Sequence, residues 1–103
     1  MFLVLWEFDV KPGREKRFES VYGPEGDWAL LFRRDSTYQR TLLLRDPSRA
    51  CTYVTCDFWE TRGAYESFRR ANSHEYLALD EICEELTLAE RRIGEFEQLG
   101  DDE

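Results

Sequence analysis

Residues 41–60 constrain the fold of this chain more than any other stretch. An apolar segment at 42–44 is followed by a turn sequence at 45–48 and then by β-branched and aromatic residues. Such residues favour a pleated, half-buried strand, and the Asp-Pro pair favours a turn. The sequence therefore predicts a β-hairpin with strands over about 38–45 and 51–60.

Two further strands are expected at the ends of the chain. Apolar residues alternate over residues 2–10, which places every second side chain on one face of a strand. The last strand is expected over 88–97, with Ile93 and Phe96 as its apolar anchors. The inward face of the first strand is predicted to carry Phe2, Val4, Trp6, Phe8 and Val10.

Apolar residues spaced at i, i+3 and i+4 predict the helices. One helical region runs over 14–33 and is kinked at 23–26, where glycine and proline interrupt it. A second region follows the hairpin and is interrupted at 72–73. Its last helix is predicted to present an apolar stripe of Leu79, Ile82, Cys83 and Leu86. The expected N-caps are Asp27, Thr61 and Ser73.

The resulting order is strand, helix, strand, strand, helix, strand. This order predicts a ferredoxin-like α+β domain, βαββαβ, with a four-stranded antiparallel sheet and its helices on one face. At 103 residues the chain is expected to form one domain over 1–98, followed by a short acidic tail at 99–103.

The strands carry apolar side chains on both faces. Leu3 and Leu5 oppose the inward residues of the first strand, and Val54, Cys56 and Phe58 oppose Tyr53 and Trp59. Since the helices cover only one face, we expect a second copy of the chain to cover the other, as a homodimer packed sheet to sheet.

Composition excludes several partners and chemistries. A net charge of −8 disfavours binding to nucleic acid or to an anionic membrane, and no apolar run is long enough to span a membrane. The three cysteines form no CxxC pair, and we expect free thiols in a reducing cytoplasm. With one histidine and no glycine-rich phosphate loop, the sequence does not predict a hydrolase triad, a zinc site or a nucleotide site.

Five segments together resemble one known family. They are VKPGREKRF after the first strand, GDWALLFRRDSTY before the second, TLLLRDP in the hairpin, FWETRGAYESF after it and ERRIGEF in the last strand. In order and spacing they resemble the antibiotic biosynthesis monooxygenases of the dimeric α+β barrel superfamily. The resemblance implies a dimer of back-to-back sheets and a pocket between helices and sheet in each subunit. It also implies that no cofactor is needed, because some relatives oxidise polycyclic phenols to quinones with molecular oxygen and neither metal nor flavin.

Other relatives degrade haem, and the resemblance does not extend to them. Trp6, Phe68 and Ala78 stand where those relatives have Asn, Trp and His. The single histidine, His74, lies beside the expected cap Ser73; we interpret it as an exposed residue at a helix start, with a base in the pocket as the alternative.

By resemblance to the quinone-forming relatives, Trp59, Tyr65 and Thr55 are the candidate catalytic residues. Trp59 and Tyr65 would be aromatic walls, and the Thr55 hydroxyl would orient the substrate. Core packing is the alternative for each aromatic residue. The further candidates for substrate contact are Trp6, Trp28, Tyr53, Phe68 and His74.

Arg40 is an unusual charge within an apolar strand. We expect it to pair with Glu7 or Asp9 across the sheet or across the dimer seam, with contact to an acidic ligand as the alternative. The function predicted overall is that of a monooxygenase-like protein for a small aromatic or polyketide-type compound. A dimer that binds such a molecule without reaction, and a scaffold whose aromatic residues only fill space, are the alternatives.

Overall fold

A computed structural model describes residues 1–100 of the chain. The predicted tail therefore lies partly outside the described residues, at 101–103. The elements, in chain order, are β1 (Phe2–Val10), α1 (Glu15–Tyr22), α2 (Asp27–Phe32), β2 (Tyr38–Arg45), β3 (Thr52–Trp59), α3 (Arg62–Ala71), α4 (Ser73–Cys83), a 3₁₀ turn (Glu84–Leu86) and β4 (Thr87–Glu97).

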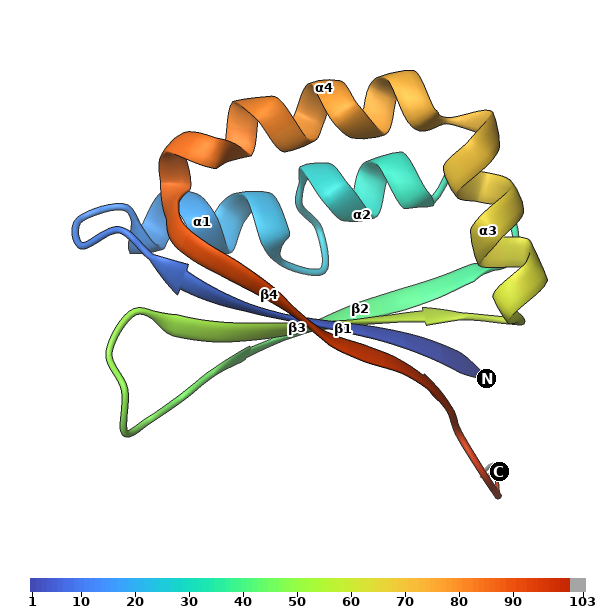
Figure 1. Ribbon diagram of the computed structural model, residues 1–103, viewed down its shortest axis with the longest axis horizontal. Helices are drawn as coiled ribbons and strands as arrows, with labels where there is room; N and C mark the ends of the chain where they lie inside the picture. Colours follow the sequence, from blue (N-terminus) through green and yellow to red (C-terminus); the bar gives the residue numbers. More distant parts are fainter. Residues whose placement is uncertain (101–103) are drawn as a thin grey trace.

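The strands form one antiparallel sheet in the order β2-β3-β1-β4. This order and connectivity confirm the predicted ferredoxin-like α+β fold. Figure 1 shows helices α1 to α4 on one side of the sheet, with α4 lying above α1 and α2, and none of residues 1–100 forms a helix on the opposite side. We call the two sides the helix face and the outer face.

The helix face is closed by an aromatic core. Phe2, Val4, Phe8 and Val10 of β1 are buried there, as the alternation predicts, and Phe18 of α1 packs on Phe8 with ring centroids 5.3 Å apart. Because these side chains carry no polar atoms, their burial supplies most of the driving force for closing the helices onto the sheet.

The kink between α1 and α2 depends on Gly26. A Cβ atom at this position would lie 2.4 Å from the carbonyl oxygen of Ser20 and 2.3 Å from that of Val21. Only glycine therefore allows α2 to begin so close to the end of α1 and to bring Trp28 onto the sheet.

The predicted helix caps were right at one position and wrong at two. The Thr61 hydroxyl accepts a hydrogen bond from the backbone N–H of Ala64 at 3.1 Å, as expected. Asp27 and Ser73 are instead the first residues of α2 and α4, whose N-cap positions are occupied by Gly26 and Asn72 without a side-chain cap. The short turns before both helices shift each start by one residue relative to the cap pattern.

The predicted stripe of α4 is also only partly buried. Cys83 and Leu86 are buried, but Ile82 is 61% exposed. Leu86 lies in the 3₁₀ turn, not in α4. α4 turns Cys83 to the core, and Ile82, one residue earlier, lies about 100° around the helix from it.

A register irregularity in the β1–β4 pair lies next to Trp6. Leu5 is opposite Gly94 whereas Trp6 is opposite Arg92, so Ile93 is bulged out of the ladder. Gly94 has φ of +154°, which other residues rarely adopt. Bulges re-aim neighbouring side chains, and Trp6 is only half-buried where the flanking Val4 and Phe8 are fully buried.

The outer face combines an apolar stripe with ion pairs at one end. Register places Leu3, Leu5, Leu42, Leu44, Val54, Cys56, Phe58 and Phe96 on it. Leu44 and Phe96 are 51% and 48% exposed. At the hairpin end, the Glu7 carboxylate pairs with Arg49 at 3.1 Å and with Arg91 at 3.3 Å.

The prediction for Arg40 was wrong within the protomer. Its guanidinium lies over the ring of Phe58, 4.4 Å from the centroid, and forms no ion pair among the described residues. Glu7 and Asp9 lie on β1, which β3 separates from β2, and Arg91 reaches them from the neighbouring β4 instead. None of the described helices is long and apolar enough to cross a membrane.

Candidate functional site

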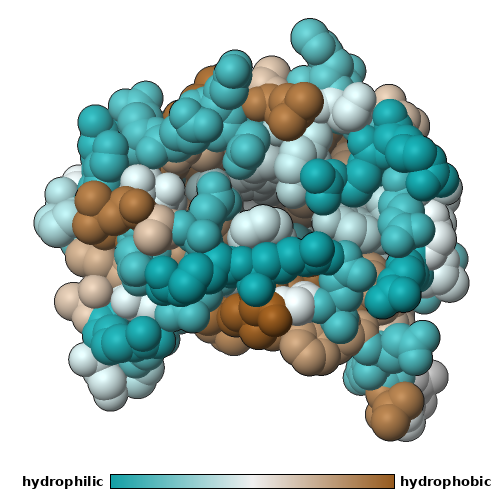
Figure 2. Space-filling model, in the orientation of Figure 1, coloured by the Kyte–Doolittle hydropathy of each residue, from teal (hydrophilic) through white to brown (hydrophobic). Residues whose placement is uncertain are grey.

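A cavity of about 190 Å³ lies between the helix face of the sheet and the helices above it. Figure 2 shows the surface hollowed between the helical layer and the sheet. Its apolar walls come from Val4, Trp6, Phe8, Trp28, Phe32 and Leu77. Its polar groups are Thr41, Thr55, Asp57, Arg69, Asp80 and Glu90, together with three tyrosines, Tyr22, Tyr65 and Tyr76.

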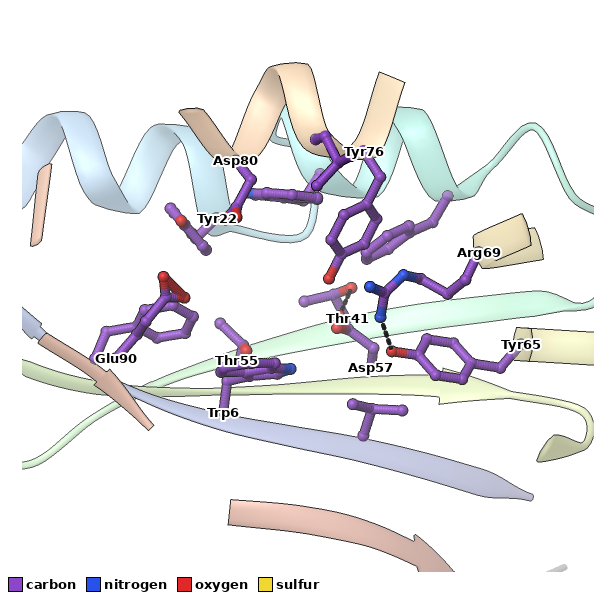
Figure 3. A pocket seen from close by; sticks show the side chains of 15 residues that line it. Trp6, Tyr22, Thr41, Thr55, Asp57, Tyr65, Arg69, Tyr76, Asp80 and Glu90 are labelled. Carbon is purple, nitrogen blue, oxygen red and sulfur yellow. Dashed lines mark hydrogen bonds between the residues drawn. The ribbon is translucent and has the colours of Figure 1, made fainter. Parts of the chain in front are cut away.

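Asp57 of β3 lies on the sheet side of this cavity (Figure 3). Its Oδ1 accepts a hydrogen bond from the Thr41 hydroxyl at 2.6 Å, and that hydroxyl is 2.7 Å from the hydroxyl of Tyr38. Burial raises the pKa of Asp57 to about 7, although the hydrogen bond from Thr41 acts in the opposite direction. The carboxyl can therefore gain or lose a proton near neutral pH.

Arg69 supplies positive charge to the same cavity from α3. Its guanidinium donates a hydrogen bond to the Tyr65 hydroxyl at 2.8 Å and lies 3.9 Å from the ring centroid of Tyr76. Burial raises the pKa of Tyr76, which Arg69 partly offsets, so this phenol stays protonated. The tyrosines thus hold the guanidinium in place through a hydrogen bond and a cation–π contact.

The opposite end of the cavity is acidic. Asp80 of α4 and Glu90 of β4 approach it, and Glu90 is exposed to solvent at the edge (Figure 3). Desolvation first, and then repulsion by Asp80 and Glu84, raises the pKa of Glu90. Burial likewise raises the pKa of Tyr22, which lies between them. A ligand in the cavity therefore meets a cation at one end and carboxyl groups at the other.

Four of the residues proposed from the sequence meet in this cavity. Thr55 and Tyr65, two of the three candidate catalytic residues, line it together with Trp6 and Trp28. These residues come from β3, α3, β1 and α2, so the fold brings together side chains that are far apart in the sequence.

Trp59 does not line the cavity. It has no exposed surface and packs behind Tyr65, with ring centroids 5.4 Å apart. Phe68 is also buried, 5.1 Å from the Trp59 ring, and lies outside the cavity wall. Both therefore contact the cavity only through their neighbours.

Tyr53 and His74 lie elsewhere. The Tyr53 hydroxyl donates to Glu19 at 2.5 Å on the α1 side, and burial and this carboxylate raise its pKa to about 12. His74 is exposed in the first turn of α4, as the interpretation as a helix-start residue expects.

Sequence reasoning missed Asp57, Thr41 and Arg69. The signal for Asp57 was its position in the alternation of β3, on the same face as Thr55 and Trp59, where a carboxylate is unexpected. The signal for Arg69 was its i, i+4 spacing from Tyr65 on an exposed-looking helix.

Residues 1–100 contain no group of three or more His, Cys, Asp or Glu side chains placed to hold a metal ion. The chemistry that the cavity groups themselves offer is proton transfer at Asp57 and binding of a negative oxygen by Arg69.

Comparison with known proteins gives structural matches only. No family model and no curated protein matches the sequence. SnoaB, a cofactor-independent oxygenase from Streptomyces nogalater, superposes with a TM-score of 0.76 at 21% identity, covering 97% of this chain and 94% of its own. A SnoaB mutant gives a TM-score of 0.73 at 25% identity, covering 97% of each chain.

The fold is that of the antibiotic biosynthesis monooxygenases. A Bordetella bronchiseptica protein named "putative antibiotic biosynthesis monooxygenase" also shares it, with a TM-score of 0.71 at 22% identity over 95% of this chain and 96% of its own. The resemblance drawn from the sequence is thus confirmed at the level of the fold, which does not by itself define a reaction.

Proposed function

We propose that this protein is a cofactor-independent monooxygenase acting on a small aromatic or polyketide-type compound. The observation that carries the proposal is the aromatic cavity that holds a titratable carboxyl, Asp57, and a guanidinium, Arg69. Oxidation of a phenol by molecular oxygen needs an apolar site, a hydrogen bond to the phenolate and a proton carrier. The fold shared with the cofactor-independent oxygenase SnoaB supports the same reaction class.

The size of the cavity favours a flat, compact substrate. At about 190 Å³ it is smaller than the sites of drug-sized ligands, which are roughly 300–1,000 Å³. Trp6 and Trp28 would contact the faces or edges of the rings, and the Arg69 end would receive the substrate oxygen that becomes negative.

Thr55 and Tyr65 are proposed to contact the substrate directly. Thr55 offers a hydroxyl from β3, and the Tyr65 hydroxyl is fixed by the hydrogen bond from Arg69. Trp59 is proposed as a positioning residue, because its buried ring supports that of Tyr65 from behind.

A homodimer is the proposed assembly. The outer face exposes Leu42, Leu44 and Phe96 in a stripe that the protomer leaves uncovered. A second copy pairing through the same surface would bury it around a twofold axis. Light scattering should give twice the protomer mass of 12.3 kDa, and a mass of 12.3 kDa at micromolar concentration would contradict the dimer.

The reaction is tested by incubating the protein with anthrone and with 1-naphthol in air-saturated buffer. We expect oxygen uptake, formation of the quinone, and strong loss of the rate in Tyr65→Phe. Glu66→Gln serves as the matched control, because Glu66 is exposed on α3 and takes no part in the cavity. Absence of oxygen uptake across both substrates would contradict the proposed reaction.

The alternative function is a dimer that binds a small apolar molecule without reaction. Thr55 favours this alternative, since it stands where the quinone-forming relatives would benefit most from an amide. Tight binding of an apolar dye, displaced by naphthol but unaccompanied by oxygen uptake, would support it.

A further inference from the structure

We propose that Asp57 is the proton acceptor of the cavity and removes the acidic proton of a phenol or anthrone-type ligand. This inference rests on the proposed function, because it names the base for that reaction. Asp57 lines the cavity from β3, one of the two middle strands, together with Thr55 of the same strand and Tyr65 of α3.

One oxygen of Asp57 is held and the other is free to react. Oδ1 accepts the hydrogen bond from Thr41, whose hydroxyl lies next to that of Tyr38. If Thr41 donates to Asp57, Tyr38 must donate to Thr41, so both hydroxyls stabilise the carboxylate. Oδ2 accepts no hydrogen bond from the described residues. It is therefore available to accept a proton from a ligand.

The other carboxyl groups of the cavity are less suited to the task. Asp80 and Glu90 lie at its acidic end, and Glu90 is exposed to solvent. Burial raises the pKa of both groups, but the Glu90 side chain is exposed at the cavity edge, whereas Asp57 is half-buried beside Thr41 and has a pKa of about 7. A base with a pKa near the working pH transfers protons most effectively.

Asp57 forms no ion pair with any of the described residues packed around it. From β2 it faces Thr41 and Tyr38, and from β1 the apolar Val4. From α3 and α4 the ionisable groups of the cavity are Arg69, Tyr65, Tyr76 and Asp80. Arg69 donates to Tyr65 rather than to Asp57, so its remaining N–H groups are available to a substrate oxygen.

With anthrone as substrate, the ring CH₂ group loses a proton to Oδ2 of Asp57. The C–H bond breaks, an O–H bond forms on the carboxyl, and the electron pair remains on the ring as an enolate whose oxygen faces Arg69. The enolate carbon then forms a C–O bond with molecular oxygen, which is reduced to a peroxide anion. That anion takes the proton back from Asp57, and the hydroperoxide loses water as the carbonyl forms. The balance is CH₂ + O₂ → C=O + H₂O, with the carboxylate regenerated.

The test is an anaerobic titration with anthrone, because enolate formation can then be followed without turnover. In wild-type protein at pH 8, the visible absorption of the enolate should appear on binding and be lost in Asp57→Asn. Glu66→Gln removes a carboxylate from the exposed side of α3 and should retain the absorption. In air, Asp57→Asn should lower the rate of oxygen uptake by about 100-fold.

Thr41→Val provides a second variant should Asp57→Asn fail to fold. Removal of its hydrogen bond raises the pKa of Asp57 further, so the pH midpoint of enolate formation should move above that of the wild type. An unchanged midpoint would contradict the role of Asp57.

The outcomes separate this inference from the proposed function. Equal enolate absorption in Asp57→Asn, or none in the wild type, would overturn the role of Asp57. Oxygen uptake at the same rate in Asp57→Asn would also overturn it while leaving the monooxygenase in place. Enolate formation that depends on Asp57 but leads to no oxygen uptake in air would overturn the monooxygenase and support Asp57 as the proton acceptor.

Discussion

β3 contributes alternate residues to the two faces of the sheet, and only one of these faces is covered by helices. Tyr53, Thr55, Asp57 and Trp59 face the helices, whereas Val54, Cys56 and Phe58 face away from them. The helix face is closed by the chain's own helices but retains a cavity with polar groups inside it. The outer face carries an apolar stripe with Arg40 over Phe58 at one end, and no helix formed by residues 1–100 covers it (Figure 1).

The difference indicates that the helix face is suited to binding and chemistry and the outer face to association with another protein surface. A buried carboxyl without an ion pair costs stability, which a structural core has no reason to retain. On the helix face Asp57 is a half-buried carboxyl without an ion pair among the described residues, and its raised pKa favours the cavity as a site for chemistry. On the outer face Glu7 is paired with Arg49 and Arg91 at the hairpin end, and Arg40 lies over the Phe58 ring at the other end. The stripe between them is suited to another apolar surface.

The largest expected effect is on the packed part of the helix face. Trp59→Ala should lower the free energy of unfolding by roughly 3–5 kcal/mol, because the ring is fully buried among Phe32, Tyr38 and Tyr65. Urea denaturation measures the change. Leu30→Ala, at a position 58% exposed on α2, is the control and should shift it by less than about 0.5 kcal/mol. Equal effects of the two substitutions would contradict the packing described.

The outer face is tested by Leu42→Asp. A charge placed in the stripe must lose its water when a second copy covers it, so dimerisation should weaken by about 3 kcal/mol, or roughly 100-fold in the dissociation constant. Sedimentation equilibrium measures the constant, and circular dichroism checks that the protomer stays folded. An unchanged dissociation constant would show that the second copy does not cover this stripe.

The cost of the buried carboxyl is tested through the pH dependence of stability. The folded-state pKa of Asp57 is about 7, above its ordinary value of 3.8, so the folded protein binds more protons between these limits. Its contribution to stability therefore falls as pH rises from about 4 to 7. The two pKa values set an upper limit of about 4 kcal/mol, and solvent screening of the half-buried side chain should reduce it to about 2 kcal/mol. Asp57→Asn should therefore be more stable than wild type by about 2 kcal/mol at pH 8 and equal to it at pH 4. A difference that is the same at both pH values would contradict a raised pKa.

The smallest effect is expected at the ion pairs of the outer face. Arg91→Ala removes the contacts to Glu7 and Asp9, but these groups are exposed or half-buried, so the loss should be below about 0.5 kcal/mol. The hydrogen bond from Arg91 lowers the pKa of Asp9, and this contribution is present at neutral pH and lost on acidification. Urea denaturation at low and high salt measures the change in the free energy of unfolding. A decrease of more than about 2 kcal/mol would contradict a minor contribution of these ion pairs to stability.

Alternation was sufficient to predict β1, because every second residue of that strand except Trp6 is buried on the helix face. The bounds of β1 and β2 were predicted to the residue. The sequence was less informative about which aromatic residues form a wall and which fill the core. Trp28 and Trp59 are both large and buried, and only the path of the helices decides that Trp28 borders the cavity while Trp59 packs behind it.

Asp57 shows why the rest of the site was not predicted. Its place in the alternation was readable, but an inward carboxylate on a strand is equally compatible with an ion pair to a neighbouring strand or helix. Its significance depends on the absence of such a partner among the described residues, which follows from Arg69 turning toward Tyr65. The orientation of Arg69 depends on its contacts with Tyr65 of α3 and Tyr76 of α4. A contact between two helices cannot be predicted from the sequence pattern of either helix alone.

The most direct test of the account is a carbon-13 NMR titration of the Asp57 carboxyl in the free protein, assigned by its loss in Asp57→Asn. We expect a midpoint near pH 7, with the carboxyl becoming protonated at pH 8 when anthrone is added without oxygen. A midpoint near the ordinary aspartate value of 3.8, together with no change on adding anthrone, would contradict it.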